Sequence, residues 1–220
     1  MIQAVIFDLD GTLLDTLGDI ALVMNELLER HGATPHDKDA YRLFVGRGLN
    51  NLVYDALPDA RKDDAEKLYR EALGIFASRG VGIAVLYPGV RETLEALRSK
   101  GLPLALLSNK PEAAVKAIIK ELNMEDFFCL IAGATPDIPL KPHPDSVLPI
   151  VRQLQRLVPG CASASIAFVG DSDVDMRTAK NAGLYAVGAA WGFRGAAELA
   201  EAGADIILAK IRELFPLAGL

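Results

Sequence analysis

The sequence of 220 residues predicts an α/β protein: a doubly wound parallel sheet that carries an inserted all-helical domain. From Tyr87 onwards, short apolar runs alternate with helical patterns, as is typical of chains that form parallel sheets. Between residues 15 and 82, by contrast, apolar residues recur at helical spacing and no convincing strand is found. We therefore expect a core domain formed by residues 1–14 and 83–220, and a helical domain formed by residues 15–82.

The first strand of the core ends in two carboxylates. Val5-Ile6-Phe7 begins an apolar run of the kind that a buried parallel strand needs. Asp8 and Asp10 follow two residues apart, and positions i and i+2 of a strand share a face, so both can face one site. A turn would explain Asp10 before glycine, but it would not explain Asp8. Two ionised carboxylates this close need a cation, and hard oxygen ligands suit Mg²⁺.

The helical domain is expected to contain four helical segments. The first carries an apolar repeat that stops near Gly32, and the others cover residues 37–45, 49–56 and 60–78. Arg47 lies in a Gly-Arg-Gly break between two of them. It is the best candidate in this domain for contacting a substrate carboxylate, because the planar guanidinium matches a carboxylate in shape and charge. An exposed surface arginine is the alternative.

The remaining segments of the core alternate as a parallel sheet requires. Strands are expected over residues 102–107, 127–132, 165–169, 185–190 and 205–208. Helices are expected over residues 90–100, 111–122, 144–157 and 195–202, and one more follows Asp171 and ends at residue 182. Pro149 is expected to bend its helix or to delay its start. In sheets of this kind, ligands bind beyond the carboxyl ends of the strands.

Polar residues interrupt the pattern of the core where the predicted strands end. Ser108, Asn109 and Lys110 follow one strand, and Asp171 follows another, with Asp175 four residues further on. Lys141 lies in a loop between elements. Because the carboxyl ends of parallel strands meet at one edge, we expect these side chains to converge with the two carboxylates of the first strand.

Four ordered segments carry a resemblance to a known family. They are Asp8-Leu9-Asp10-Gly11-Thr12, Leu107-Ser108-Asn109, Lys141-Pro142 and Gly170-Asp171-Ser172-Asp173-Val174-Asp175. In these segments the chain resembles the haloacid dehalogenase-like (HAD) phosphohydrolases, and the resemblance spans the whole core. It implies a Rossmann-like core and a helical C1 cap at the position of the insert.

Finer features resemble the phosphoglycolate phosphatase branch of that family. They are Ser108-Asn109-Lys110-Pro111-Glu112, Lys141-Pro142-His143-Pro144-Asp145 and Trp191-Gly192-Phe193. Ser108 departs mildly from the pattern, since threonine is frequent there, but the hydroxyl is retained.

The resemblance implies a role in phosphoryl transfer for each polar residue at the strand ends. Asp8 is the nucleophile that attacks phosphorus, and Asp10 protonates the leaving oxygen and later activates water. Mg²⁺ binds the side chains of Asp8 and Asp171 and the main-chain carbonyl of Asp10.

The substrate phosphate is held by donors and by a positive charge. Ser108, together with Thr12 and Asn109, is expected to bind the substrate. Lys141 supplies a positive charge to the phosphate and to the nucleophile. Asp175 is expected to support the site by holding Lys141 or a metal-bound water.

Composition narrows the classes of partner. The chain has 29 acidic and 23 basic residues, a net charge of −6, which argues against binding to nucleic acid or to an anionic membrane surface. No apolar run approaches the ~18 residues that a membrane span needs. Cys129 and Cys161 form no disulfide or zinc pattern, which fits a reducing cytoplasm. We expect a cytoplasmic monomer or homodimer that binds a small anionic phosphoester.

The sequence thus predicts a Mg²⁺-dependent phosphatase that hydrolyses a small phosphomonoester, 2-phosphoglycolate first, through a phospho-aspartate. A pyrophosphatase, a sugar-phosphate phosphatase and a phosphomutase are alternatives with the same chemistry. A phosphonatase would need a lysine in an apolar stretch of the insert, and none is found. A regulatory or binding module with a phosphorylated aspartate is the non-enzyme alternative, and Asp10 argues against it because it supplies an acid and base beside the nucleophile.

Overall fold

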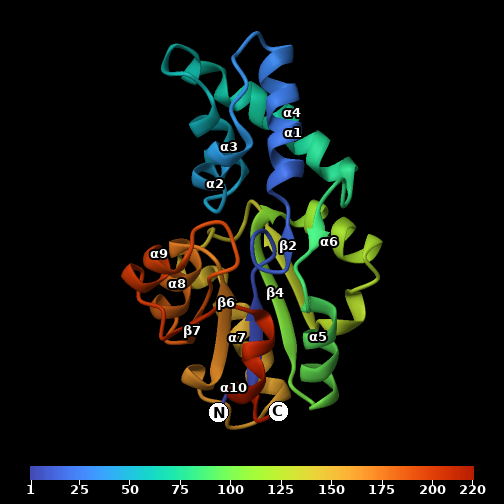
Figure 1. The fold of residues 1–220 in the computed structure, drawn as a ribbon, viewed down its shortest axis with the longest axis vertical. Helices are drawn as coiled ribbons and strands as arrows, with labels where there is room; N and C mark the ends of the chain where they lie inside the picture. Colours follow the sequence, from blue (N-terminus) through green and yellow to red (C-terminus); the bar gives the residue numbers. More distant parts are fainter.

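A computed structural model describes residues 1–220 and shows a six-stranded parallel sheet (Figure 1). The strands lie in the order β5-β4-β1-β6-β7-β8. Their bounds are Ala4–Phe7 for β1, Leu104–Pro111 for β4, Leu130–Ala134 for β5, Ile166–Gly170 for β6, Tyr185–Ala189 for β7 and Ile206–Leu208 for β8. All of the pairings in this sheet are parallel, and β1 lies between β4 and β6. The predicted fold class is confirmed.

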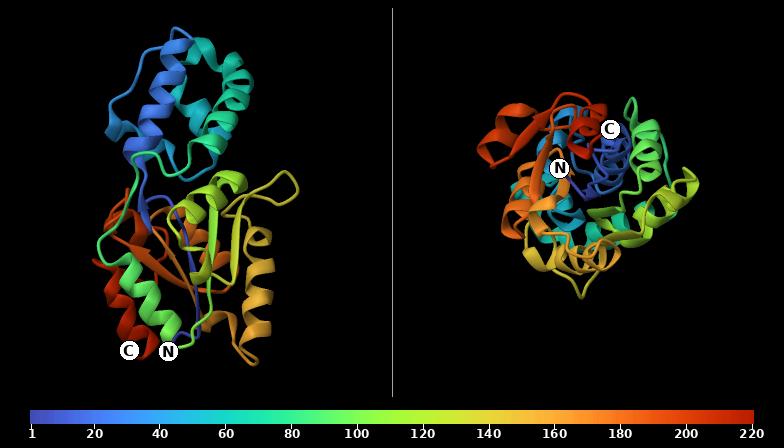
Figure 2. Two further views of the ribbon diagram at one scale, coloured as in Figure 1. Left: turned by 90° about the vertical axis from the view of Figure 1, so that its right-hand side faces the viewer. Right: turned by 90° about the horizontal axis from the view of Figure 1, so that it is seen from below.

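Helices cover both faces of the sheet, as the layers in Figure 2 show. Val5 and Phe7 of β1 belong to the hydrophobic cluster on one face of the sheet. Ala4 and Ile6 belong to a second cluster, on the other face. The first cluster includes side chains of α5 (Val90–Ser99), α6 (Glu112–Glu121) and α10 (Leu214–Ala218). The second includes side chains of α7 (Leu148–Leu157), α8 (Asp173–Asn181) and α9 (Ala196–Glu201). Because successive strand residues alternate between two covered faces, every position of β1 is apolar.

The helical insert lies beyond the carboxyl ends of the central strands (Figures 1 and 2). It consists of α1 (Leu17–Arg30), α2 (Tyr41–Phe44), α3 (Leu49–Ala56) and α4 (Ala65–Arg79), with 3₁₀ turns at Lys38–Ala40 and Asp59–Asp64. These helices bury a hydrophobic cluster of their own, which Phe193 and Ala114 of the core join from below. None of the helices is both long enough and apolar enough to cross a membrane.

Two short strands connect the insert to the core. β2 (Leu14–Asp15) pairs in antiparallel fashion with β3 (Val85–Leu86), with Leu14 opposite Leu86 and Asp15 opposite Val85. The chain therefore leaves the core and returns to it through adjacent, hydrogen-bonded segments. Sequence patterns do not reveal this pair, because two residues are too few to show an alternation.

Several helices begin later than their sequence patterns predict. The helix expected over residues 60–78 begins with the 3₁₀ turn Asp59–Asp64 and becomes α4 at Ala65. The helix expected over residues 144–157 begins as the 3₁₀ turn Pro144–Ser146, and α7 starts at Leu148 with Pro149 in its first turn. Pro149 thus delays the start of the helix, because proline is tolerated in a first turn but not within the helix.

Candidate active site

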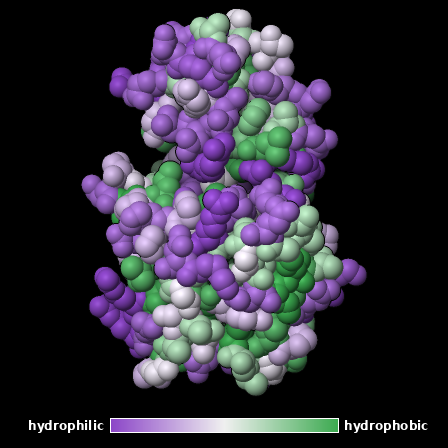
Figure 3. All heavy atoms as spheres, turned by 90° about the vertical axis from the view of Figure 1, so that its left-hand side faces the viewer, coloured by the Kyte–Doolittle hydropathy of each residue, from purple (hydrophilic) through white to green (hydrophobic).

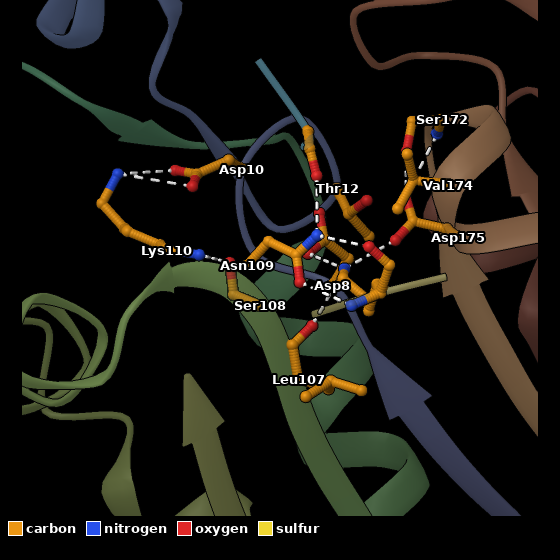
Figure 4. A network of polar contacts seen from close by, with 12 residues as sticks. Asp8, Asp10, Thr12, Leu107, Ser108, Asn109, Lys110, Ser172, Val174 and Asp175 are labelled. Carbon is orange, nitrogen blue, oxygen red and sulfur yellow. Dashed lines mark hydrogen bonds and ion pairs between the residues drawn. The ribbon is translucent and has the colours of Figure 1, made fainter. Parts of the chain in front are cut away.

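Lys141 lies at the centre of a buried polar network at the carboxyl edge of the sheet, and Figure 4 labels its partners Asp8, Leu107 and Asp175. Its ammonium donates hydrogen bonds to Asp8 Oδ1 and to Asp175 Oδ1, both at 2.7 Å, and to the carbonyl of Leu107 at 3.2 Å. The side chain of Lys141 is only 3% exposed. This ion pair joins Asp8 and Lys141, which are 133 positions apart in the sequence. Asp8, Lys141 and Asp175 therefore lie together at the edge of the sheet, as the positions of the strand ends predict.

The start of α8 fixes Asp175 in a geometry that its local sequence encodes. Ser172 and Asp175 form a capping box, in which the Ser172 N–H and hydroxyl both donate to Asp175 Oδ2, at 3.1 and 2.6 Å. The other oxygen of Asp175 accepts from Lys141. Both oxygens of this carboxylate are therefore engaged by the protein.

Asp171 is held from two other segments. The Phe193 N–H donates to its Oδ2 at 2.7 Å, and the Thr12 hydroxyl donates to its Oδ1 at 3.4 Å. Gly11 and Gly192 close around the same carboxylate, since a Cβ at either position would lie 2.2 Å from an Asp171 side-chain atom. Only glycine at both positions leaves room for this carboxylate.

Burial and like charge perturb the acidic residues of the site. Burial raises the pKa of Asp8 to about 7, and the Lys141 ammonium opposes that rise. Burial, with the nearby Asp175 charge, raises the pKa of Asp171 well above its usual range. The pKa of Lys141 is raised by its two carboxylate partners against the effect of burial. The site thus places three carboxylates around a single ammonium, an excess of negative charge in a buried place.

This excess fits a divalent cation. One carboxylate oxygen from each of Asp8, Asp171 and Asp175 lies within 4.8 Å of the others. The oxygens of Asp175 are taken by Ser172 and Lys141, at 2.6 and 2.7 Å. Asp8 Oδ2 accepts no hydrogen bond from the protein, and Asp171 Oδ1 has only the long 3.4 Å contact from the Thr12 hydroxyl. Asp8 and Asp171 are therefore the carboxylates best placed to bind a hard cation such as Mg²⁺.

Ser108 and Asn109 lie where β4 loses its regular pairing with β5, between Leu107 and Pro111. The Ser108 hydroxyl accepts from the Lys110 N–H at 3.2 Å, and its own O–H has no acceptor in the protein. This hydroxyl can therefore donate to a ligand. It lines the cavity at the sheet edge together with Asp8.

The amide group of Asn109 is fully used within the protein. Its Oδ1 accepts from the Lys141 N–H at 2.9 Å, and its Nδ2 donates to the Lys141 carbonyl at 3.0 Å. The same Nδ2 donates at 2.9 Å to the carbonyl of Gly46 in the insert. Asn109, expected to bind substrate, therefore positions Lys141 and contacts the insert.

Asp10 points away from Asp8 in Figure 4 and pairs with Lys110, a strand-end lysine to which the sequence patterns assigned no role. The Lys110 ammonium lies 3.0 Å from Asp10 Oδ1 and 3.3 Å from Oδ2. The side chains of Lys110 and Asp10 are only 9% and 11% exposed. The signal for Lys110 was its place directly after Ser108-Asn109.

A cavity of about 50 Å³ lies between the sheet edge and the insert. It has room for a few water molecules or one small anion. The surface narrows between insert and core on the face shown in Figure 3. The insert supplies the apolar part of the lining, which includes Ile20, Val45, Leu49, Leu52 and Phe76. The core supplies the polar part, which includes Asp8, Asp10, Ser108, Asn109, Lys110, Lys141, Asp171, Asp175 and Arg194.

Two of the expected site residues lie outside this cavity. Arg47 is more than half exposed and its guanidinium pairs with Asp55 at 2.7 Å, so the structure does not bring it to the site. Thr12 is fully buried behind Asp171, where its hydroxyl supports that carboxylate instead of facing a substrate.

Arg194 is a cavity residue that sequence reasoning missed. Its guanidinium donates to the carbonyls of Leu43 and Val45 in the insert, at 3.0 and 3.1 Å. It follows Trp191-Gly192-Phe193 directly, and that segment was the available signal. Arg194 therefore links the core to the insert beside the site.

The comparisons with known proteins agree with this geometry. Residues 5–189 match the model of the family described as haloacid dehalogenase-like hydrolase. A phosphoglycolate phosphatase of Chromobacterium violaceum is 35% identical over 98% of this chain and 96% of its own length. One of Pseudomonas putida is 34% identical over 97% of this chain and 79% of its own length.

A solved structure shows the same fold. A haloacid dehalogenase-like family hydrolase from Streptococcus pneumoniae superposes with a TM-score of 0.82 at 26% identity, covering 98% of this chain and 97% of its own. The sheet order, the strand-end site and these matches lead to one assignment: the chain belongs to the haloacid dehalogenase-like hydrolase family, as an enzyme of its phosphoglycolate phosphatase-like branch.

Proposed function

We propose that this enzyme is a Mg²⁺-dependent phosphatase that hydrolyses a small phosphomonoester, 2-phosphoglycolate first, through a phospho-aspartate. The observation that carries the proposal is the buried Asp8–Lys141–Asp175 network, which leaves one oxygen of Asp8 free beside a small cavity. A free carboxylate oxygen fixed by an ammonium is suited to attack phosphorus. The matches to phosphoglycolate phosphatases support the choice of substrate.

Asp8 and Asp171, with the main-chain carbonyl of Asp10, would hold the metal ion. When bound, Mg²⁺ would offset the repulsion between the carboxylates and the negatively charged phosphoryl oxygens. The side chain of Asp175 would instead keep Lys141 in place, since both of its oxygens are engaged.

The reaction proceeds in two displacements on phosphorus. In the first, one carboxylate oxygen of Asp8 forms a bond to phosphorus, while the other would remain available to the metal ion. The bond from phosphorus to the leaving oxygen breaks as Asp10 gives that oxygen a proton. In the second, Asp10 takes a proton from water, whose oxygen attacks phosphorus and releases Asp8 as a carboxylate. The Ser108 hydroxyl and the Lys141 ammonium stabilise the negative charge on the phosphoryl group in both steps.

The size and lining of the cavity support a small substrate. A volume of about 50 Å³ suits a phosphoryl group with a short leaving group better than a long one. The apolar side chains of the insert would exclude water from the phospho-aspartate until product leaves.

The test is an assay of small phosphoesters with Mg²⁺ and with EDTA, using Asp8→Asn and the exposed control Asp126→Asn. We expect 2-phosphoglycolate to be hydrolysed, Asp8→Asn to lose at least about 1,000-fold in kcat, and the control to match wild type. Equal turnover by Asp8→Asn would refute the mechanism. Preferential release of phosphate from pyrophosphate or a sugar phosphate would refute the substrate, and isomerised sugar phosphate with little free phosphate would indicate a mutase.

A further inference from the structure

We propose that Lys110 determines substrate specificity by binding a carboxylate on the leaving group of the phosphoester. The inference rests on the proposed function and assigns a residue and a ligand chemistry to the leaving-group side of the cavity. Lys110 and Asp10 both line that cavity, and their ion pair is almost fully buried. The ring of Phe76, from α4 of the insert, covers the Lys110 ammonium, and its centroid lies 5.4 Å from the Lys110 Nζ.

The ion pair with Lys110 keeps Asp10 from the position that it needs in order to protonate the leaving oxygen. Figure 4 shows the Asp10 carboxylate turned toward Lys110 and away from the network around Asp8. To reach an oxygen bonded to the phosphoryl group on Asp8, this carboxylate must leave Lys110. The ammonium, at the end of a side chain that is only 9% exposed, would then remain without a counter-charge, which is strongly unfavourable. A carboxylate on the substrate would replace Asp10 as its partner.

The other cations of the cavity are not free for this task. Lys141 is bound by Asp8 and Asp175. Arg194 donates to two carbonyls of the insert and lies 3.6 Å from Glu198. Lys110 has Asp10 as its only ion-pair partner, so it is the cavity cation whose partner must move during the reaction.

Lys110 could bind either a carboxylate or a second phosphate on the leaving group, since both are oxyanions. The cavity favours the carboxylate, which is the smaller of the two. A carboxylate on a two-carbon leaving group is more compact than a second phosphate, and the cavity measures only about 50 Å³. The aromatic ring over Lys110 excludes water, which strengthens a charge-assisted hydrogen bond to such a group.

The experiment compares three esters on wild type and on Lys110→Met, which keeps most of the length of the side chain and removes its charge. The esters are 2-phosphoglycolate, 2-hydroxyethyl phosphate, which replaces the carboxylate by an alcohol, and ethylene glycol bisphosphate. We expect Lys110→Met to lose about 100-fold in kcat/KM on 2-phosphoglycolate and less than about threefold on 2-hydroxyethyl phosphate. Lys110→Arg should retain most of the preference, and the exposed control Lys116→Met should match wild type on every ester.

Two outcomes would overturn the inference. An equal loss on all three esters would mean that Lys110 only positions Asp10, and a loss confined to the bisphosphate would identify a phosphate as the oxyanion. Failure of the proposed function looks different, since wild type itself would then hydrolyse none of the esters. Thermal unfolding of each variant shows whether it is folded. If Lys110→Met is unstable, the activities of Lys110→Arg on the three esters test the inference instead.

Discussion

Replacing Lys141 by methionine should destabilise the metal-free enzyme in a way that depends on pH. Lys141 is the one ammonium shared by Asp8 and Asp175, and each pair spans 2.7 Å in a buried place. Removing one member of a buried ion pair typically costs about 3–5 kcal/mol, because the remaining charge has no partner. Lys141→Met leaves two carboxylates in that position, so we expect a loss of this size in the free energy of unfolding near pH 8.

The loss should be smaller near pH 5. Burial already raises the pKa of Asp8 to about 7, and Lys141 opposes the rise, so its removal raises that pKa further. A carboxyl with a raised pKa in the folded state contributes stability below its unfolded pKa and loses it as pH rises through the folded pKa. Near pH 5 the Asp8 carboxyl of the variant is therefore protonated and needs no partner.

Urea unfolding in EDTA at about pH 5 and pH 8 measures both values, provided that the m-values of wild type and variant agree. The double variant Lys141→Met/Asp175→Asn is the matched control, because it also removes one of the two carboxylates left without a partner. It should recover part of the stability at pH 8. Equal destabilisation at the two pH values, or a further loss in the double variant, would refute the electrostatic account.

Two further substitutions test how the site is positioned. Asn109→Ala removes three hydrogen bonds of 2.9–3.0 Å and should lower the free energy of unfolding by about 2–4 kcal/mol. It should also lower kcat by a larger factor than it raises KM, and an unchanged kcat in a folded variant would contradict this. Gly192→Ala would place a Cβ 2.2 Å from Asp171 Cβ and 2.4 Å from the Gly11 carbonyl oxygen, so it should weaken Mg²⁺ binding at least about tenfold in a calorimetric titration. Gly74→Ala, in α4 with no atom within 4 Å of the new Cβ, is its control and should bind Mg²⁺ as wild type does.

The residues at the strand ends could be predicted because topology alone brings them together. Once β1, β4 and β6 are parallel neighbours, the residues that follow them share one edge, whatever their side chains do. Asp8 and Asp171 lie at that edge as expected. A backbone argument of this kind needs only the order of strands, which the alternation of patterns supplies.

Which cation faces the cavity could not be predicted in the same way. Arg47 was chosen for the chemistry of its side chain, yet its guanidinium turns outward to Asp55, while Lys110 from the core lies within. The direction of a long side chain depends on neighbours that distant segments contribute. Phe76, which covers Lys110, belongs to the helical insert, whereas Lys110 belongs to the core. Thr12 was misplaced for a related reason, since its hydroxyl finds a partner in Asp171, 159 positions away.

Asn109 shows why the position of the insert and the geometry of the site are linked. Its Nδ2 divides two donors between Gly46 of the insert and the Lys141 carbonyl, and its Oδ1 holds the Lys141 N–H. Moving the insert away would remove one acceptor from an amide that is buried at the site, at a net cost of about 1 kcal/mol. Arg194 adds two donors to the neighbouring carbonyls of Leu43 and Val45. The same short stretch of insert is therefore held by the core residue that positions Lys141, so closing the insert and ordering the lysine favour each other.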